Sequence, residues 1–473
     1  MSDVLFIFPT DNAEYHLGIA TLSAVLKREG FSVALLMIDF RHDQETIDAE
    51  LLAKVQTEKP SLIAVSAMSF YWTMMDPWLH RMKGLSDAPI IVGGWQPTLA
   101  PDETIQHACV DYICLGEGEF AMLELVQSLK TGNDTTQIEN IWTTTTGELK
   151  KNKLRSPIPD LDVLPTPDYD LFEFADVMKR HQMRILGELG GPFQTASHMV
   201  GRGCAYQCTY CCNHAFQQAY GLSAKPFIRR RSVPVAMKDL EEIVTRYKPE
   251  WLELWDEDLT LDRQWLQNFS VEYPRSIGLP FSICAHPHNA QGDKFEILAK
   301  AGCRLVMMGI ECGNEEYRKT YLRRNISNQK IMNAFALARE NGIMTLSFNM
   351  FGLPFETADQ IRETLSLNEQ IEPDYFLIFV YNPLTGTKLA TQAKDAGLLE
   401  GIKLSNYGYS GSGGGNIKGV DDDTFQQLHT EAIALQQRLD ELRKQRYPEN
   451  MNWGPSLPPG SEQLSQIQSL LGN

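Results

Sequence analysis

The sequence lacks an excess of basic residues. Its 473 residues include 60 acidic and 43 basic side chains, which gives a formal net charge of -17. Nucleic acids and anionic membrane surfaces attract a basic face. We therefore expect no nucleic acid and no membrane as the main partner, although Arg229, Arg230 and Arg231 form one tight basic run.

Long apolar runs and a recognisable leader are also lacking. No stretch approaches the 18 uninterrupted apolar residues that indicate a membrane span. The first ten residues carry an acid at Asp3 and only a short apolar run, whereas a signal peptide has a basic start and a longer apolar core. Nine cysteines in such a chain do not indicate a disulfide framework. We expect a cytoplasmic protein whose thiols can bind metal.

The first 150 residues alternate short apolar runs with segments of helical spacing. Runs such as Val4–Phe8 and Leu62–Ser66 are typical of buried parallel strands. The alternation predicts an α/β fold with a Rossmann-like, doubly wound parallel sheet, in which ligands bind at the carboxyl ends of the strands. Small residues fall at or near those ends, namely Gly18, Ser66, Gly93, Gly94, Gly116 and Gly118.

A second βα series follows a proline-rich segment between Pro157 and Pro167, which predicts a semi-rigid linker. The apolar runs predict strands at 195–200, 251–255, 280–284, 304–310, 345–351 and 375–380. Six such units indicate a partial (β/α)6 barrel with its active site at the C-terminal rim. A Gly/Ser loop at 410–415 and a helix at 422–446 are expected after it. The predicted organisation is a first domain at 1–150, a linker at 151–194, the barrel at 195–390 and a small helical C-terminal region at 391–473.

Three cysteines with the spacing Cys-x3-Cys-x2-Cys lie directly after the first barrel strand. They are Cys204, Cys208 and Cys211. Three thiolates on one tight loop match three irons of a cubane iron–sulfur cluster. A zinc site is the alternative, because His214 completes a Cys3His set. Cys212 is out of register and is expected to be a bystander.

This segment resembles the signature of the radical S-adenosylmethionine (SAM) superfamily, with an aromatic residue, Tyr210, before the third cysteine. Further stretches are similar to the same superfamily in order and spacing, namely Trp255–Asp258, Gly309–Gly313, Met350–Thr357 and Pro383–Thr387. The resemblance covers about residues 195–390. It implies a [4Fe–4S] cluster on the three cysteines, whose open iron binds SAM. It also implies SAM contacts from Tyr210, Glu257 and Glu311.

The first domain is similar to the cobalamin-binding domain that is fused to one subgroup of radical SAM enzymes. The matching stretches are Leu17-Gly18, Val92–Thr98 and Leu115–Glu119. The resemblance implies cobalamin at the strand ends. The implied contacts are Gly18, Ser66, Gly93, Gly94, Trp95, Gln96, Gly116, Glu117 and Gly118. The Asp-x-His-x-x-Gly motif is absent, so no histidine ligand to cobalt is expected, and His16 is expected to be an ordinary loop residue. The alternative is a Rossmann-like domain without cofactor.

Three functions follow from these resemblances. The first is a cobalamin-dependent radical SAM methyltransferase that methylates an unactivated carbon or phosphorus centre. The second is a cyclase, oxidase or ring-rearranging enzyme with the same cofactors. The third is a non-catalytic cobalamin or iron–sulfur sensor. The partners expected are a small-molecule or peptide substrate and an electron donor such as flavodoxin or ferredoxin. His286 and His288, after the third barrel strand, are candidates for proton transfer or substrate contact, or are rim residues without a special role.

Overall fold

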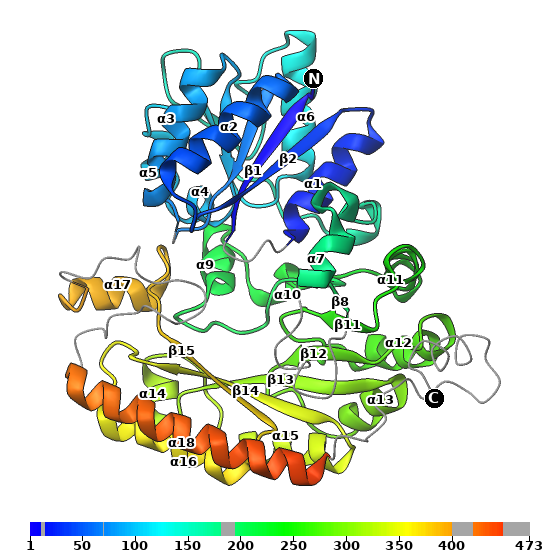
Figure 1. The fold of residues 1–473 in the computed structure, drawn as a ribbon, viewed down its shortest axis with the longest axis vertical. Coiled ribbons are helices and arrows are strands. Elements are labelled where there is room, and N and C mark those ends of the chain that lie inside the picture. Colours follow the sequence, from blue (N-terminus) through cyan, green and yellow to red (C-terminus); the bar gives the residue numbers. More distant parts are fainter. Residues whose placement is uncertain (11–14, 70, 181–193, 400–419, 448–473) are drawn as a thin grey trace. The chain divides into compact units, whose positions relative to one another are not determined.

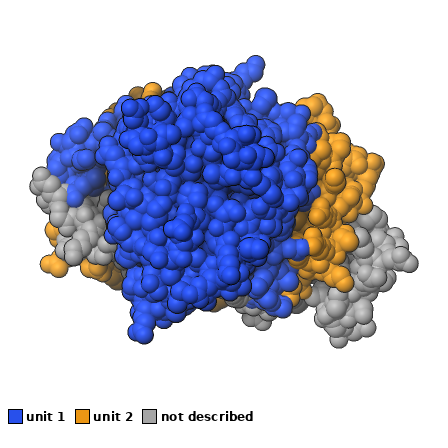
Figure 2. Space-filling model, turned by 90° about the horizontal axis from the view of Figure 1, so that it is seen from above, with its two compact units in different colours: residues 1–181, 203–229, 382–415 blue, residues 182–202, 230–381, 416–473 orange. Residues whose placement is uncertain are grey.

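The computed structural model describes residues 1–10, 15–69, 71–180, 194–399 and 420–447 (Figure 1). The predicted Gly/Ser loop at 410–415 lies outside the described residues. The chain divides into two compact units, coloured separately in Figure 2. The first unit holds residues 1–181, 203–229 and 382–415, and the second holds 182–202, 230–381 and 416–473. The cysteine motif therefore belongs to the same unit as the N-terminal sheet.

The first unit is built on a seven-stranded sheet. Its strands, in spatial order, are β2 (Val33–Asp39), β1 (Val4–Thr10), β3 (Leu62–Ser66), β4 (Ile90–Gly93), β5 (Tyr112–Cys114), β6 (Ile141–Thr143) and β7 (Lys150–Lys151). The first five of these pair in parallel, and β6 and β7 extend the sheet antiparallel. The apolar run of β1 is buried along its whole length, as the sequence pattern predicts for a central parallel strand.

Helices cover both faces of this sheet. The first-unit helices before the cysteine motif are α1 (Leu17–Arg28), α2 (Gln44–Glu58), η1 (Thr73–Met75), α3 (Asp76–Leu85), α4 (Trp95–Leu99), α5 (Pro101–Ile105), α6 (Glu119–Thr131), η2 (Leu161–Val163), η3 (Tyr169–Phe172) and α7 (Phe174–Arg180). Alternate strand residues such as Leu5 and Ile63 pack with Leu51 of α2 and Leu79 of α3 in one core. Helices α1 and α6 contact each other on the opposite face (Figure 1). The predicted doubly wound sheet is confirmed.

The strand order 2-1-3 creates a topological switch point between β1 and β3. The chain leaves β1 for its neighbour β2 and then crosses to the other side of β1 to form β3. Ligands of doubly wound sheets bind at the carboxyl ends of the strands beside such a point. Gly18 follows β1 and Ser66 ends β3, so the fold directs a ligand to two of the residues that the sequence singled out.

The described part of the predicted linker packs onto the first unit. Ile158, Leu161 and Leu164 form a core cluster with Val25 of α1. Ser23 donates a hydrogen bond to Asp168 at 2.5 Å. The apolar residues between the prolines therefore bury themselves against α1, so this part of the segment is a packed extension of the domain.

The second unit contains a six-stranded sheet in which all neighbours are parallel. Its strands are β8 (Thr195–His198), β11 (Trp251–Leu254), β12 (Phe281–Ala285), β13 (Cys303–Glu311), β14 (Met344–Phe351) and β15 (Tyr375–Val380). Their spatial order follows the chain order, as in a barrel that winds in one direction. The predicted partial barrel is confirmed, and each predicted strand overlaps an observed one.

Helices between the strands cover one face of this sheet. They are α11 (Val233–Tyr247), α12 (Arg263–Ser276), α13 (Lys294–Ala301), α14 (Glu315–Thr320), α15 (Asn328–Glu340) and α16 (Ala358–Ile371), and the C-terminal helix is α18 (Asp422–Arg446). Helix α18 packs on α16 and β15 through Leu428 and Leu435. Among the described residues, no helix is both long and apolar enough to cross a membrane.

Candidate cofactor site

The cysteine motif forms the turn between β9 (Gly201–Arg202) and α9 (Cys212–Ala219). Cys208 is buried, and Cys204 and Cys211 are partly exposed. Cys211 is the N-cap residue of α9, and its N–H donates to the carbonyl of Cys208 at 3.3 Å. The partial positive charge of a helix N-terminus stabilises a thiolate. The three thiols thus lie on one short turn, next to a helix N-terminus that favours the thiolate, which is the form that binds metal. Cys212 is the first residue of the helix.

Two neighbouring residues fix the start of this turn. Gln217, 1% exposed, donates from Nε2 to the carbonyl of Cys204 at 2.6 Å. Gly203 has a φ of 85°, in the left-handed region. A Cβ atom at Gly203 would collide with the carbonyl of Phe227 in α10 (Ala224–Phe227). The motif therefore needs glycine at this position.

The number of ligands bears on the zinc alternative. Cys204, Cys208 and Cys211 are three thiols on one turn, and His214 lies in α9. A structural zinc site takes four ligands, whereas three thiolates match three irons of a cubane cluster and leave the fourth iron open. The turn therefore fits a cluster without requiring His214.

Three segments that are distant in sequence meet around this turn within the first unit. Helix α9 packs on α4, with the rings of Phe216 and Trp95 at 6.3 Å. Leu389, in α17 (Lys388–Asp395), donates its N–H to the carbonyl of Thr209 inside the cysteine motif at 2.9 Å. Gly386, which precedes α17, lies against Leu99 of α4. The motif is therefore held between the Gly93–Thr98 turn and the Pro383–Thr387 turn.

The predicted cobalamin contacts lie at the carboxyl ends of the strands. Ser66 and Gly93 are Cα partners at the ends of β3 and β4, and both are partly exposed. Gly94 has a φ of 100° and starts α4, whose Gln96 donates its N–H to the carbonyl of Ala67. Further along the edge, Gly116 donates its N–H to the Thr98 hydroxyl at 3.0 Å. These turns form one hydrogen-bonded rim with small, partly exposed residues on it, as a cofactor tail beside glycines requires.

Glu117 has a different environment from its neighbours on this rim. Its carboxylate accepts hydrogen bonds from Arg229 at 2.8 and 2.9 Å and from the N–H of Ile158 at 2.7 Å. Its own N–H donates to the hydroxyl of Tyr220 at 2.8 Å. The carboxylate is thus used within the protein, and its direct contact with cobalamin stays a prediction.

Comparison with known families identifies two regions of the chain. Residues 9–126 match the B12 binding domain, and residues 199–367 match the radical SAM superfamily. The two matched regions include the glycine-rich rim and the cysteine motif described above. This chain belongs to the cobalamin-dependent radical SAM enzymes. The predicted family, the assignment as an enzyme and the cofactors ([4Fe–4S] cluster, SAM and cobalamin) are confirmed.

Individual relatives of this cobalamin-dependent radical SAM enzyme are distant but cover most of its length. An uncharacterised methyltransferase of Pyrococcus horikoshii is 23% identical over 418 residues, which are 85% of this chain and 86% of the relative. An anaerobic magnesium-protoporphyrin IX monomethyl ester cyclase of Rubrivivax gelatinosus is 24% identical and covers 80% of this chain and 68% of the relative. The solved radical SAM methyltransferase TsrM of Kitasatospora setae superposes with a TM-score of 0.67, at 18% identity over 85% of this chain and 77% of TsrM.

The candidate SAM contacts of the radical SAM enzyme lie at or after the ends of strands. Glu257 is exposed after β11, whereas its neighbours Asp256 and Asp258 are buried and burial raises their pKa values. Asp256 accepts the N–H of Val200 at 3.0 Å, which is a structural role. Glu311 has a φ of 71° at a register shift between β13 and β14 and is partly exposed. Tyr210 is a partly exposed residue of the first unit.

The two histidines after β12 differ in exposure. His286 is buried, and its Nδ1 accepts the N–H of His288 at 3.1 Å. Burial, followed by the charge of Arg324, holds the pKa of His286 far below its usual value. His288 is exposed beside Lys330, and partial burial and this lysine lower its pKa. Burial therefore favours the neutral ring of His286, and its role in proton transfer or substrate contact stays a prediction.

Sequence reasoning missed a buried carboxylate on β11. Glu253 is 0% exposed and accepts hydrogen bonds from the Ser197 hydroxyl at 2.7 Å and from Trp255 Nε1 at 3.0 Å. In the strand alternation it lies on the face opposite to Leu252 and Leu254, whose in-register partners Phe281 and Ile283 are on β12. Phe281 packs against Phe269 of α12, so the Glu253 side faces away from the covering helices. The acidic residue in the middle of the predicted strand 251–255 was the sequence signal that could have revealed this buried carboxylate.

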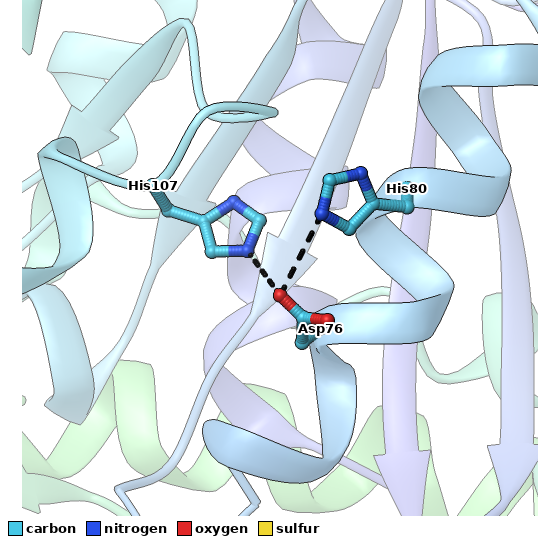
Figure 3. A group of neighbouring side chains, drawn as sticks. All are labelled: Asp76, His80 and His107. Atoms are coloured by element: carbon cyan, nitrogen blue, oxygen red, sulfur yellow. Dashed lines mark hydrogen bonds and ion pairs between the residues drawn. The ribbon is translucent and has the colours of Figure 1, made fainter.

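A second group of possible metal ligands lies on the sheet's helical layer, away from the cysteine motif in sequence. Asp76 accepts a hydrogen bond from His107 Nε2 at 2.9 Å, and His80 Nε2 lies 3.7 Å from the same oxygen (Figure 3). The Nδ1 atom of His107 accepts the N–H of Cys109. Because Nδ1 accepts this bond, Nε2 is the nitrogen that donates to Asp76. The proximity of these side chains is thus explained by hydrogen bonds that connect α3 to the loop after α5.

Proposed function

We propose that this enzyme transfers a methyl group to an unactivated carbon or phosphorus centre. The observation that carries the proposal is the composition of the first unit. The cysteine motif, the glycine-rich rim of the B12 binding domain and the Pro383–Thr387 turn pack together there. An enzyme that uses both cofactors on one substrate needs them close together. When bound, the cluster supplies the electron that cleaves SAM, and cobalamin supplies a transferable methyl group.

In this proposal the residues have separate tasks. Cys204, Cys208 and Cys211 hold the cluster, with Tyr210 beside the third ligand. Glu257 and Glu311 contact SAM, because carboxylates attract a cationic ligand and accept hydrogen bonds from its hydroxyls. The remaining contacts belong to cobalamin, namely Gly18, Ser66, Gly93, Gly94, Trp95, Gln96, Gly116, Glu117 and Gly118. His286 and His288 remain candidates for substrate contacts.

The partners belong to the same proposal. The substrate is a small molecule or peptide, and an electron donor such as flavodoxin or ferredoxin serves the cluster in the cytoplasm. Nucleic acid is not a partner, because acidic residues outnumber basic ones by 60 to 43.

A cobalamin-dependent cyclisation is the second candidate. The relative from Rubrivivax gelatinosus supports it, because that protein is named a cyclase and covers 80% of this chain. The two candidates consume SAM differently. A methyltransferase uses one SAM molecule for the radical, which yields 5′-deoxyadenosine, and a second to restore the methyl group, which yields S-adenosylhomocysteine. A cyclase yields only the first by-product.

The experiment is anaerobic turnover of the reconstituted enzyme on a metabolite extract with SAM carrying a labelled methyl group. We expect both by-products in equal amounts and a labelled metabolite. A Cys208→Ala variant is the control that should abolish 5′-deoxyadenosine formation. An unlabelled product together with 5′-deoxyadenosine alone would favour cyclisation, and the absence of 5′-deoxyadenosine from a fully loaded enzyme would leave the sensor function.

A further inference from the structure

We propose that Glu117, Tyr220 and Arg229 are positioning residues that hold the cluster segment, defined as residues 203–229, on the cobalamin-binding rim. The inference rests on the proposed cofactor sites but assigns these three residues a task that the proposed function does not include. All three lie in the first unit. Tyr220 and Arg229 both reach the same Gly116-Glu117 turn from the C-terminal half of the segment.

Tyr220 fills a space that exists only because residue 116 is glycine. Gly116 has a φ of 66°, and a Cβ atom there would collide with the Tyr220 hydroxyl. The hydroxyl accepts the N–H of Glu117 at 2.8 Å. Burial raises the pKa of Tyr220, so the side chain stays a neutral phenol. The tyrosine is therefore seated on the backbone of the turn itself.

Arg229 joins the same turn to the packed linker. One of its terminal nitrogens, Nη1, donates to both carboxylate oxygens of Glu117 and to the carbonyl of Ile158 at 3.0 Å. The Glu117 carboxylate also accepts the N–H of Ile158 at 2.7 Å. The arginine side chain is 6% exposed and the glutamate 16% exposed. A largely buried pair with every partner in place is costly to break, because one charge is then left without compensation.

These contacts close the cluster segment at its base. The carbonyl of Phe227 lies against Gly203, so the two ends of the segment are adjacent. Arg229 Nε donates to that same carbonyl at 3.1 Å. Between the ends lie the three cysteines and α9, which packs on α4 of the rim. The segment is thus a closed loop that contacts the B12 binding domain both through α9 and at the Gly116-Glu117 turn. The contacts at that turn set where the cluster ligands lie relative to the rim.

The first test needs no cofactor. Hydrogen–deuterium exchange of the full apo chain is compared for wild type, Tyr220→Phe and the matched control Tyr112→Phe. Tyr112 is a buried first-unit tyrosine that also makes a side-chain hydrogen bond, to Thr135 at 3.1 Å, whereas Tyr220 is partly exposed. Losing one buried hydrogen bond changes a local opening equilibrium by up to about tenfold. We expect Tyr220→Phe to speed exchange in residues 203–219 by that order and Tyr112→Phe to leave them unchanged. Equal exchange in both variants would overturn the proposal.

The second test uses loaded enzyme. Power saturation of the cob(II)alamin electron paramagnetic resonance signal reports the distance to a reduced cluster, since a nearby paramagnet speeds relaxation. We expect the Arg229→Met variant to retain iron and cobalamin but to lose most of this relaxation enhancement. The Arg229→Lys variant keeps the positive charge but lacks the planar guanidinium group, so we expect it to lose part of the enhancement. Unchanged relaxation in Arg229→Met would contradict the positioning role. If the wild-type protein bound no cluster or no cobalamin, the proposed function would be refuted instead. The exchange experiment would then still test whether Glu117, Tyr220 and Arg229 position the cluster segment.

Discussion

Gly93 and Gly94 are adjacent in the sequence but have different backbone roles. Gly94 has a φ of 100°, and a Cβ atom there would lie 2.9 Å from the carbonyl oxygen of Ala67. Gly93 has no positive φ, and the nearest atom to its Cβ position is 3.9 Å away. Gly94 is therefore needed by the fold, whereas Gly93 is free to accept a side chain. Of the two glycines, only Gly93 can be substituted to test cobalamin binding without straining the backbone.

We expect Gly93→Leu to weaken cobalamin binding by at least about tenfold while folding is retained. Gly93 lies on the rim where the cofactor tail is proposed to lie, so the added side chain takes up space there. Gly94→Ala is expected to destabilise the protein by about 1–3 kcal/mol through backbone strain. Equilibrium dialysis with hydroxocobalamin and thermal unfolding separate the two effects. Wild-type affinity in Gly93→Leu would remove Gly93 from the cobalamin site.

His16 is a helix cap and not a free loop residue. Its Nδ1 accepts the N–H of Ile19 at 3.2 Å at the start of α1, and its ring packs edge-on against Phe8 at 5.0 Å. Burial lowers its pKa from 6.5 to about 4. The folded protein therefore favours the neutral ring, and only a neutral Nδ1 can accept this hydrogen bond.

The sign of the pH effect follows from that shift. The folded pKa lies below the unfolded value, so the unfolded chain binds more protons between pH 6.5 and 4. The stabilisation is full above about pH 6.5 and is lost as the pH falls towards 4. Because the ring is only partly buried, we expect a loss of about 1–2 kcal/mol. His16→Asn keeps a capping acceptor that does not titrate. Urea unfolding at pH 7.5 and 5.0 should show a smaller pH dependence for this variant, and equal pH dependence would refute the assignment.

At the scale of elements, the C-terminal helix α18 completes the core of the second unit. Its buried residues recur with helical spacing at Phe425, Leu428, Ala432, Leu435 and Leu439. They pack on Ile361 and Leu365 of α16 and on Phe376 of β15. The helix therefore covers an apolar surface that the six βα units alone leave open.

We expect Leu428→Ala to lower the free energy of unfolding by about 2–4 kcal/mol, because Leu428 is 0% exposed and truncation leaves a cavity. Ile433→Ala on the same helix is the control, since Ile433 is 49% exposed and should change stability by less than about 1 kcal/mol. Chemical denaturation of both variants makes the comparison. Similar losses would mean that the packing face of α18 is assigned wrongly.

The sequence predicted long, patterned elements well and short or polar ones poorly. Leu62–Ser66 was predicted with its observed ends, because an apolar run between turn signals defines a buried strand. Strands β6 and β7, with three and two residues, are too short to show a period. Helix α3 was not assigned either. The roles of Tyr220 and Arg229 depend on partners more than 100 residues away, which no local pattern reveals.

At the scale of the whole molecule, the unit boundaries do not follow the two family domains. The B12 binding domain ends at residue 126 and the radical SAM match begins at residue 199. The first unit nevertheless includes residues 203–229, which lie inside the radical SAM match, and residues 382–415, which follow it. The cysteine motif lies inside the radical SAM match, as predicted, and it packs within the same unit as the N-terminal sheet. Tertiary contacts such as α4 with α9 decide this, and sequence order does not encode them.

The central claim is that one chain carries a cluster on Cys204, Cys208 and Cys211 together with cobalamin on the adjoining rim. The most direct measurement is the iron, sulfide and cobalamin content of anaerobically reconstituted protein after gel filtration. We predict about four irons and about one cobalamin per wild-type chain. The variants Cys204→Ala, Cys208→Ala and Cys211→Ala should lose the iron and retain cobalamin. The control variant Cys212→Ala should retain the full iron content. Full cluster content in Cys208→Ala, or wild type that retains no cobalamin, would contradict the account.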